Sequence, residues 1–350
     1  MKDKIIIVTV YNSENCGSFL QAYGMYTMLN KLGYDVAFLK RPSKNTSHEF
    51  LPHIITSLKF LLKFNLIKAI SITKRWFVYN RLIKTFRVCE FDSVFYNKSK
   101  VIIIGSDTLW NFDEDYFREN SDTYLGRKFT NKKIVPFAIS VANTSVDLFK
   151  SIYFSIKPPK YDYCFVRDKQ TYLCLEQVGI HNSSLVSDPS LFLNKIDYQP
   201  LCRSIDKLKK YLIIYYFGIL PDNLSVSINS IAKRNKLTIV SFFTHYSWCD
   251  IYVDSNPSLM ITYYSIASYV LTNTFHGTLF AINFGIKFAV HDEGKMKVND
   301  LLSEYDSSNH LFSNSSDLEN ILALPPVDGG LVEENRSESI HKLCIAVSYS

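Results

Sequence analysis

Short apolar runs rich in β-branched residues alternate along the chain with segments of helical apolar spacing. Residues 4–10 form the first continuous run, which is typical of a strand buried on both faces. A helical pattern over residues 18–32 follows, ends at Gly33 and leads into a second apolar run at residues 34–39. This order predicts a βαβ unit, and therefore a parallel sheet with right-handed crossovers.

The same alternation continues through the rest of the chain. Further strands are predicted at residues 101–104, 134–140, 163–166, 185–187, 211–217, 237–243 and 287–290, and one more ends at Leu271. The pattern weakens over residues 191–210, which we interpret as a linker. The prediction is an α/β fold with an N-terminal domain over residues 1–190, a C-terminal domain over residues 208–330 and a C-terminal helix over residues 331–350.

One turn between a predicted strand and a predicted helix carries a histidine. Residues 271–285 read LTNTFHGTLFAINFG, in which an apolar run ends, turns polar at Thr274, presents His276 and resumes with helical spacing. Ligands of open α/β sheets bind at the carboxyl ends of strands, where helix N-termini offer N–H groups and a positive dipole end. His276 is therefore either a titratable group of a binding site or a residue that caps the helix or satisfies a buried polar group.

The loop after the first strand also meets a helix start. It lacks the glycine patterns of dinucleotide-binding and P-loop proteins. Small and polar residues nevertheless stand there, at Asn15, Gly17 and Ser18, and they would let a ligand approach the backbone. The alternative is an ordinary βα turn with Ser18 as the helix N-cap.

Residues 46–92 interrupt the α/β alternation as a helical insert. Their Leu, Ile and Phe residues are interleaved with Lys and Arg, which indicates one or two basic amphipathic helices. Residues 51–90 could contact an anionic membrane face, where a lipid-linked substrate is met. The alternative is a solvated basic face above an apolar stripe that packs on the domain.

Composition narrows the class of protein. The chain has 350 residues, is 47% hydrophobic and carries a formal net charge of +6, which excludes a disordered protein and fits anionic partners. Its seven cysteines include no Cys-x-x-Cys pair, which indicates reduced thiols in a cytoplasm. No spacing of ligand residues implies a metal, and no motif that reads nucleic acid is present.

Four stretches, in the same order along the chain, resemble the polysaccharide pyruvyl transferase family. Residues 15–24, NCGSFLQAYG, are similar to its Asn-x-Gly-Ala/Ser-x-Leu-Gln-Ala-Tyr opening, and residues 105–111, GSDTLWN, to its Gly-Ser-Asp-Gln-x-Trp-Asn. Residues 166–168, VRD, with the later Asp188-Pro189, form the third stretch. Residues 272–278, TNTFHGT, form the fourth.

The resemblance implies a glycosyltransferase-B-like fold, in which two Rossmann-like β/α/β domains face a central cleft. The acceptor would bind on the N-terminal side and the donor on the C-terminal side. The implied reaction transfers a pyruvyl group from phosphoenolpyruvate to a sugar of a bacterial surface polysaccharide or its lipid-linked precursor, as a ketal. No cofactor is implied beyond this donor substrate, and the implied place is the cytoplasm or the inner face of the membrane.

The resemblance also implies roles for particular residues. His276 would be the general acid or a phosphate partner, and Arg167 would clamp a carboxylate or phosphate of the donor. Gly277 and Thr278 would offer N–H groups at the helix start. Substrate contacts are expected at Asn15, Gly17, Ser18, Gln21, Ser106, Asp107, Trp110, Thr274, Gly277, Thr278 and Lys297.

One position departs from the family pattern. Members that form ketals carry Arg-x-His, and here Thr274 occupies the position of that arginine. Lys297, expected in the loop before a helix at Val298, could replace the missing cation. Two alternatives therefore stand beside the pyruvyl transferase: a glycosyltransferase that uses a nucleotide sugar, and a non-catalytic component of capsule biosynthesis.

Overall fold

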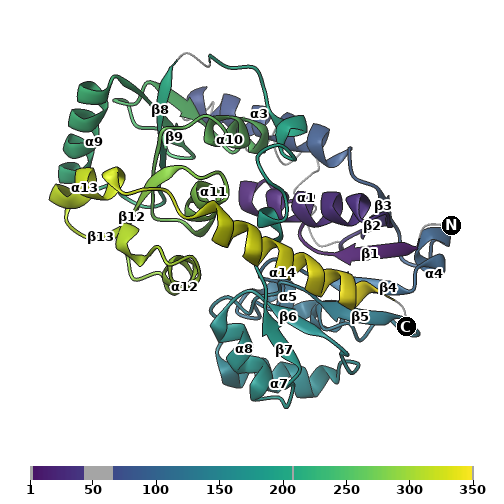
Figure 1. Ribbon diagram of the computed structural model, residues 1–350. Helices are drawn as coiled ribbons and strands as arrows, with labels where there is room; N and C mark the ends of the chain where they lie inside the picture. Colours follow the sequence, from purple (N-terminus) through teal and green to yellow (C-terminus); the bar gives the residue numbers. More distant parts are fainter. Residues whose placement is uncertain (1–2, 43–65, 207–208, 349–350) are drawn as a thin grey trace. The chain divides into compact units, whose positions relative to one another are not determined.

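The computed structural model of the protein describes residues 3–42, 66–206 and 209–348 (Figure 1). The chain forms two compact units. Unit 1 comprises Met1–Phe192 and Asn335–Ser350, and unit 2 comprises Leu193–Glu334. The second unit thus begins before the predicted residue 208, and the end of the chain belongs to unit 1.

Unit 1 is built on a parallel sheet with the strand order β3-β2-β1-β4-β5. A bridge from Ile139 to Val166 extends it to the pair β6-β7. The strands are β1 (Lys4–Val8), β2 (Asp35–Leu39), β3 (Val88–Cys89), β4 (Val101–Ile104), β5 (Lys133–Pro136), β6 (Cys164–Val166) and β7 (Ser183–Leu185). The continuous apolar character of β1, β2, β4 and β5 follows from burial on both faces.

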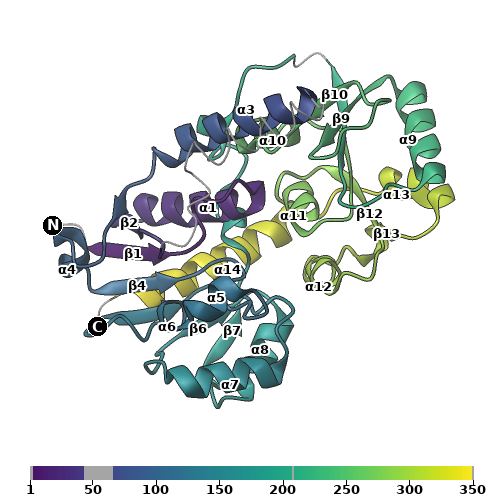
Figure 2. The ribbon, with the colours of Figure 1, turned by 180° about the vertical axis from the view of Figure 1, so that it is seen from behind.

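Helices cover both faces of this sheet (Figures 1 and 2). One face packs against α7 (Val146–Ile156) and α8 (Lys169–Glu176), and Ser145 is the N-cap of α7. The other is covered by α1 (Cys16–Lys31), whose Tyr26 stacks on Phe38 of β2. A Cβ at Gly24 of α1 would lie 2.1 Å from the carbonyl oxygen of Pro189, so glycine lets α1 approach the 3-10 turn η1 (Pro189–Leu191).

Further helices complete unit 1. Two short ones, α5 (Asp115–Glu119) and α6 (Ser121–Tyr124), lie between β4 and β5 in the chain. The last helix, α14 (Gly329–Val347), begins two residues before the predicted one. Its Ser339 hydroxyl accepts a hydrogen bond from the Ser187 N–H at 2.9 Å, and this contact ties the end of the chain to the segment after β7.

The predicted insert is described from residue 66 onward, and its residues 46–65 lie outside the described part of the chain. It contains α3 (Leu66–Ile83), then β3 of the sheet, and is followed by α4 (Val94–Lys98). Tyr79 of α3 is buried and donates to the Cys16 sulfur at 3.2 Å, whereas Ile70 and Phe77 are 51% and 56% exposed. In the described residues no helix is both long and apolar enough to cross a membrane.

Unit 2 is a second parallel sheet, with the order β10-β9-β8-β11-β12-β13. Its strands are β8 (Lys210–Tyr215), β9 (Leu237–Phe242), β10 (Ile251–Val253), β11 (Tyr269–Thr272), β12 (Lys287–His291) and β13 (Leu311–Phe312). The two edge strands, β10 and β13, were not predicted from the sequence. Both are short, so they carry little of the periodicity that identifies a strand.

Helices again lie on both faces of the sheet (Figure 1). One face packs on α9 (Asp222–Asn235) and α13 (Leu318–Ala323). The other packs on α10 (Pro257–Tyr264) and α11 (Phe275–Asn283), and α12 (Met296–Glu304) follows β12. This second core includes rings from β9, α10 and α11, such as Phe242, Tyr264 and Phe280.

Both sheets have the doubly wound order, in which the direction of strand succession reverses once. The reversal lies between β1 and β4 in unit 1, and between β8 and β11 in unit 2. Ligands of open α/β sheets bind outside the carboxyl ends of the strands at this switch point. The turn that carries His276 follows β11, so it lies at the switch point of unit 2.

Candidate functional site

The His276 turn is built from hydroxyl groups. Thr274 is the N-cap of α11, and its Oγ1 accepts the N–H of Gly277 at 3.0 Å. The Thr272 hydroxyl lies 2.9 Å from that of Thr274 and donates to the Tyr215 carbonyl of the neighbouring strand β8 at 2.7 Å. A Cβ at position 277 would lie 2.2 Å from Thr272 Oγ1, so the turn requires glycine there. His276, half-buried, is the second residue of this helix.

This capping uses the N–H groups that were expected to face a ligand. The Gly277 N–H is bonded to Thr274 Oγ1, and the Thr278 N–H to the Thr274 carbonyl at 3.1 Å. The cap thus satisfies these two first-turn donors internally, and the predicted contact of Gly277 and Thr278 with a substrate stays a prediction. The Thr274 side chain is likewise turned into the fold, and the residue is 7% exposed.

Asn273 connects the switch point to its neighbours. Its side-chain amide accepts from the Phe217 N–H at 2.9 Å and donates to the Phe217 carbonyl at 2.7 Å, which joins the ends of β8 and β11. Its backbone carbonyl accepts from Lys295 Nζ at 3.0 Å, which adds the loop after β12. Three neighbouring strand ends are thus held around the His276 turn.

Polar side chains at the ends of β8 and β12 form a hydrogen-bonded chain that was not identified from the sequence. Tyr216, at the end of β8, contacts Glu293 Oε1 at 2.7 Å and His291 Nδ1 at 2.8 Å. Glu293 Oε2 lies 2.7 Å from Lys295 Nζ. The signal in the sequence was a tyrosine at one strand end and the stretch HDEGK at another, but nothing in it showed that these ends are close.

The electrostatics of this chain fix its protonation. Partial burial raises the pKa of Glu293, but hydrogen bonds from Lys295 and Tyr216 outweigh it and lower that pKa from 4.5 to about 2. Burial and the nearby Glu293 carboxylate raise the pKa of Tyr216 above its ordinary value. At neutral pH Glu293 is therefore a carboxylate and Tyr216 keeps its proton.

Lys297 does not lie in a loop, as was predicted, but in the first turn of α12. Lys295 occupies the N-cap position of α12, so the helix begins at Met296, two residues before the predicted start at Val298. The lysine that reaches the His276 turn is Lys295, whose side chain is 42% exposed. A substrate contact by Lys297 stays a prediction.

In unit 1 the cap of α1 is Asn15 rather than Ser18. The Asn15 Oδ1 accepts from the N–H groups of Gly17 at 2.8 Å and Ser18 at 3.2 Å. These small residues therefore serve the helix start, as in an ordinary βα turn. Their predicted contact with a ligand stays a prediction.

Gln21 and Ser106 meet at the switch point of unit 1. The Gln21 amide donates to Thr9 Oγ1 at 3.2 Å and to the Ser18 carbonyl at 2.8 Å, and its oxygen accepts from the Ser106 hydroxyl. The Thr9 hydroxyl donates to the Ser106 carbonyl at 2.8 Å. All three residues are buried, so this network joins the ends of β1 and β4 from within.

Arg167 is buried between carboxylates. Its Nη1 lies 2.6 Å from Asp188 Oδ2 and its Nη2 lies 3.5 Å from Asp107 Oδ1, and the three side chains are 7%, 0% and 12% exposed. Burial lowers the pKa of Arg167, but Asp188 and Asp107 outweigh it and raise the pKa above its ordinary value. Arg167 thus joins the ends of β4, β6 and β7, and its predicted role as a donor clamp stays a prediction.

Trp110 lies in the apolar core of unit 1. Its side chain is fully buried, and its indole N–H donates to the Tyr124 carbonyl at 2.8 Å. Packing with Phe149, at 5.5 Å between ring centres, explains this tryptophan without a substrate. Asp107 stands three residues before it with positive φ, and the Asp107 carboxylate accepts from the Thr108 N–H at 2.8 Å.

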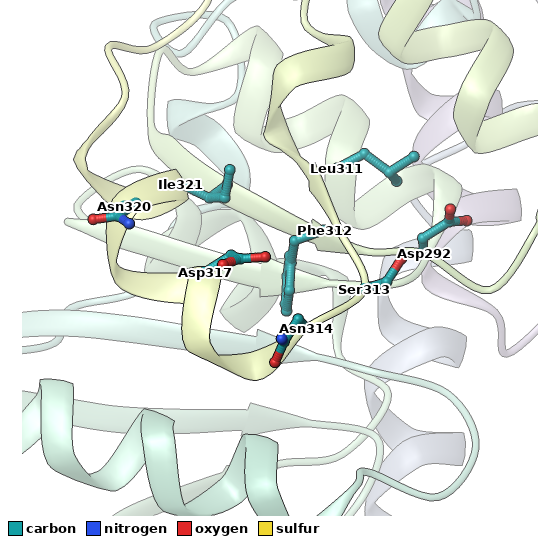
Figure 3. A pocket seen from close by; sticks show the side chains of 8 residues that line it. All are labelled: Asp292, Leu311, Phe312, Ser313, Asn314, Asp317, Asn320 and Ile321. Atoms are coloured by element: carbon teal, nitrogen blue, oxygen red, sulfur yellow. The ribbon is translucent and has the colours of Figure 1, made fainter.

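A pocket of about 510 Å³ lies at the carboxyl ends of β12 and β13 in unit 2 (Figure 3). It is lined by Asp292, Leu311, Phe312, Ser313, Asn314, Asp317, Asn320 and Ile321. In the close-up, Phe312 stands between Asp317 and Asn320 on one side and Asp292 and Ser313 on the other. Its described lining thus offers carboxylates, amides and apolar surface, with no cationic side chain.

The described residues contain no group of three or more His, Cys, Asp or Glu side chains that could hold a metal ion. The hydrogen-bonding groups at the carboxyl edges of the two sheets include amides, hydroxyls, carboxylates, one buried guanidinium and the exposed Lys295. Such groups bind and orient polar substrates and move protons.

A family model described as polysaccharide pyruvyl transferase matches residues 15–291. No curated protein matches the chain. The matched residues begin at the cap of α1 and end at His291, so they include β4 of unit 1 and both strands of the unit 2 switch point, β8 and β11.

Solved structures share the fold. A UDP-GlcNAc 2-epimerase from Methanocaldococcus jannaschii is 12% identical over 99% of both chains, with a TM-score of 0.50. A putative UDP-N-acetylglucosamine 2-epimerase from Listeria monocytogenes is 9% identical, with a TM-score of 0.53, over 99% of this chain and 98% of that chain. The UDP-GlcNAc 2-epimerase from Neisseria meningitidis is 10% identical, with a TM-score of 0.51, over 99% of this chain and 100% of that chain. At these identities the likeness shows the fold alone, and it confirms the predicted α/β class with two Rossmann-like domains of the glycosyltransferase-B type.

Proposed function

The chain belongs to the polysaccharide pyruvyl transferase family and is a transferase, and from this premise we propose that it moves a pyruvyl group from phosphoenolpyruvate to a sugar. The product is a ketal on a bacterial surface polysaccharide or on its lipid-linked precursor, made in the cytoplasm. The observation that carries the proposal is the family match over residues 15–291, which spans both units.

The chemistry requires a proton donor and a site for an anion. His276 supplies the proton that adds to the methylene carbon of phosphoenolpyruvate. A sugar hydroxyl then bonds to C2 and gives up its proton. The C2–oxygen bond to phosphate breaks, and a second hydroxyl closes the ketal. Of the two hydroxyl protons released, one balances the proton added to the methylene carbon and the other leaves with inorganic phosphate.

The anionic donor also needs positive charge, and Thr274 brings none. Lys295 supplies it, because its ammonium lies at the carboxyl edge beside the His276 turn and is partly exposed. An ammonium carries three donors, and the contacts to Asn273 and Glu293 use two of them. The positive end of α11 adds to the attraction of an anion at this edge.

The test is binding and turnover with phosphoenolpyruvate. We expect it to raise the melting temperature of the wild type, and this shift to shrink in His276→Gln and Lys295→Met but to persist in Lys233→Met, which changes an exposed lysine of α9. Turnover is followed as phosphate release with a panel of p-nitrophenyl hexosides, with mass spectrometry to detect a sugar that has gained pyruvate less water. Stabilisation by nucleotide sugars and not by phosphoenolpyruvate would favour a glycosyltransferase. Stabilisation by neither would favour a non-catalytic component.

A further inference from the structure

We propose that His291 is a second acid–base group of this enzyme, that it removes the proton from an acceptor hydroxyl, and that the pocket beside it binds the acceptor sugar. The proposal rests on the proposed function, because the hydroxyl in question is the one that attacks C2 of the donor. It names two features that lie outside the His276 turn: the imidazole at the end of β12 and the pocket at the ends of β12 and β13. Both belong to unit 2, so the proposal departs from the family resemblance, which implied that the acceptor binds on the N-terminal side.

The hydrogen-bond chain fixes the tautomer of His291. Glu293 is a carboxylate and accepts only, so the single proton of Tyr216 goes to Glu293 Oε1 at 2.7 Å. The Tyr216 oxygen can then only accept from His291 Nδ1, which lies 2.8 Å away. Neutral His291 is therefore the Nδ1–H form, with the lone pair on Nε2.

The Nε2 atom is left for a substrate. No described residue forms a hydrogen bond with it, and the imidazole is only half-buried. Among the described residues, Tyr216 and Phe312 contact the ring. Tyr216, the residue after β8, bonds Nδ1, and Phe312 of β13 packs with its ring centre 5.3 Å from that of His291. Glu293, in the loop after β12, contacts Tyr216. The ammonium of Lys295 pairs with the Glu293 carboxylate and balances its charge. His291 is connected to this ion pair through Tyr216.

The pocket is next to this imidazole. Asp292 follows His291 in the chain, its N–H donates to the Phe312 carbonyl at 2.8 Å, and both Asp292 and Phe312 line the pocket. Two carboxylates and no cation among its described lining residues disfavour the anionic donor and the diphosphate of a nucleotide sugar. Carboxylates and amides accept and donate hydrogen bonds to hydroxyl groups, so the lining suits a neutral sugar (Figure 3).

The step is a proton transfer. As the acceptor oxygen bonds to C2 of the donor, its O–H bond breaks and the proton passes to His291 Nε2. The resulting imidazolium is stabilised through Nδ1–H and Tyr216 by the Glu293 carboxylate. The proton then leaves with the phosphate group, which restores the neutral ring and closes the proton balance of the reaction. Tyr216 and Glu293 are positioning residues in this scheme, since they act through His291.

The tautomer can be measured without a substrate. In protein labelled with ¹⁵N-histidine, the His291 signals are assigned by their loss in His291→Gln. We expect the Nδ1–H form at a pH where the ring is neutral, and a change toward the Nε2–H form in Tyr216→Phe. An Nε2–H ring in the wild type, or a tautomer that does not respond to Tyr216→Phe, would overturn the proposed hydrogen-bond chain.

The role as a base is tested by turnover. His291→Gln should lower kcat by about 10²–10⁴-fold while the Kd for phosphoenolpyruvate stays unchanged. The control is His181→Gln, since His181 is 72% exposed and pairs with Glu176 in unit 1, far along the chain from this edge. Wild-type kcat in a folded His291→Gln overturns the base role alone. A wild type that does not use phosphoenolpyruvate at all overturns the proposed function, and the base role with it, whatever the tautomer.

The pocket has its own test. Asn320→Ala should raise KM for the hexoside and leave kcat and phosphoenolpyruvate binding unchanged, because Asn320 lines the pocket. Asn229→Ala on α9 is the control, since Asn229 is exposed and bonds only its own helix at Ser225. An unchanged KM in both Asn320→Ala and Asp317→Asn would overturn the placement of the sugar.

Discussion

Replacement of Arg167 by methionine separates a structural role of this arginine from the role of a donor clamp. Methionine keeps much of the side-chain volume and removes the charge. The Asp188 carboxylate, with 0% of its side chain exposed, then stays buried without its cation. A buried charge that loses its partner is costly, and we therefore expect unit 1 to lose stability whether or not a substrate is present.

The magnitude follows from the contacts that remain. Removal of one partner of a buried ion pair costs about 3–5 kcal/mol. Asp188 Oδ1 keeps the N–H of Ser190 at 2.9 Å and the Ser190 hydroxyl, and Asp107 is 12% exposed, so both carboxylates retain some stabilisation. We therefore expect the lower end of this range, about 3 kcal/mol, a large share of a typical unfolding free energy of about 5–15 kcal/mol.

Urea denaturation measures this loss, and calorimetry at low temperature measures phosphoenolpyruvate binding by the folded variant. Adding Asp188→Asn to Arg167→Met should recover about 1–3 kcal/mol, because the uncompensated charge is removed. Arg118→Met is the matched control: Arg118 is 45% exposed and pairs with Asp115, so its loss should cost less than about 1 kcal/mol. A loss below about 1 kcal/mol in Arg167→Met, together with lost donor binding, would refute the structural reading and establish the clamp.

Three further predictions concern unit 2. Gly277→Ala should destabilise by about 2–4 kcal/mol, from overpacking and a lost cap, whereas Gly329→Ala, where a Cβ meets open space, should not; equal urea midpoints would contradict this. Glu293→Gln should remove stability that the wild type has above about pH 4.5 and loses as pH falls toward about 2, since the folded-state pKa is depressed; a stability difference independent of pH between these values would contradict it. Thr274→Arg should cost about 1 kcal/mol through the lost cap and should not tighten phosphoenolpyruvate binding in calorimetry, because the threonine faces into the turn; tighter binding would place residue 274 toward the donor.

The sequence predicted most of the fold because its strands are buried on both faces. Such strands appear as continuous β-branched runs, and β4 (Val101–Ile104) has the predicted bounds. The failures lie where that signal is weak. β10 and β13 have three and two residues, and the helices α5 and α6, which were not predicted, have five and four.

The candidate site was predicted less completely. The His276 turn was found because its capping residues and its glycine are close in sequence, and local chemistry requires them. The burial of Arg167 and Trp110 could not be predicted, because both residue types also occur at exposed binding sites. Their hydrogen-bonding partners, Asp188 and Tyr124, lie elsewhere in the chain. Nor could the sequence distinguish Lys295 from Lys297, since one residue decides which lysine precedes the helix.

The chain from His291 to Asn273 shows what strand order adds to a list of strand ends. β8, β11 and β12 are neighbours in the sheet, although more than fifty residues separate Tyr216 from Asn273. Parallel neighbours end at the same edge, so a group on one strand end can serve a position on the next. That is why a threonine at position 274 need not leave the edge without a cation: Lys295 reaches the same turn from β12 and bonds the carbonyl of the residue just before Thr274. The family motif shows only that position 274 lacks the arginine. The strand order shows that Lys295, after the neighbouring strand, lies close enough to this turn to carry the positive charge instead.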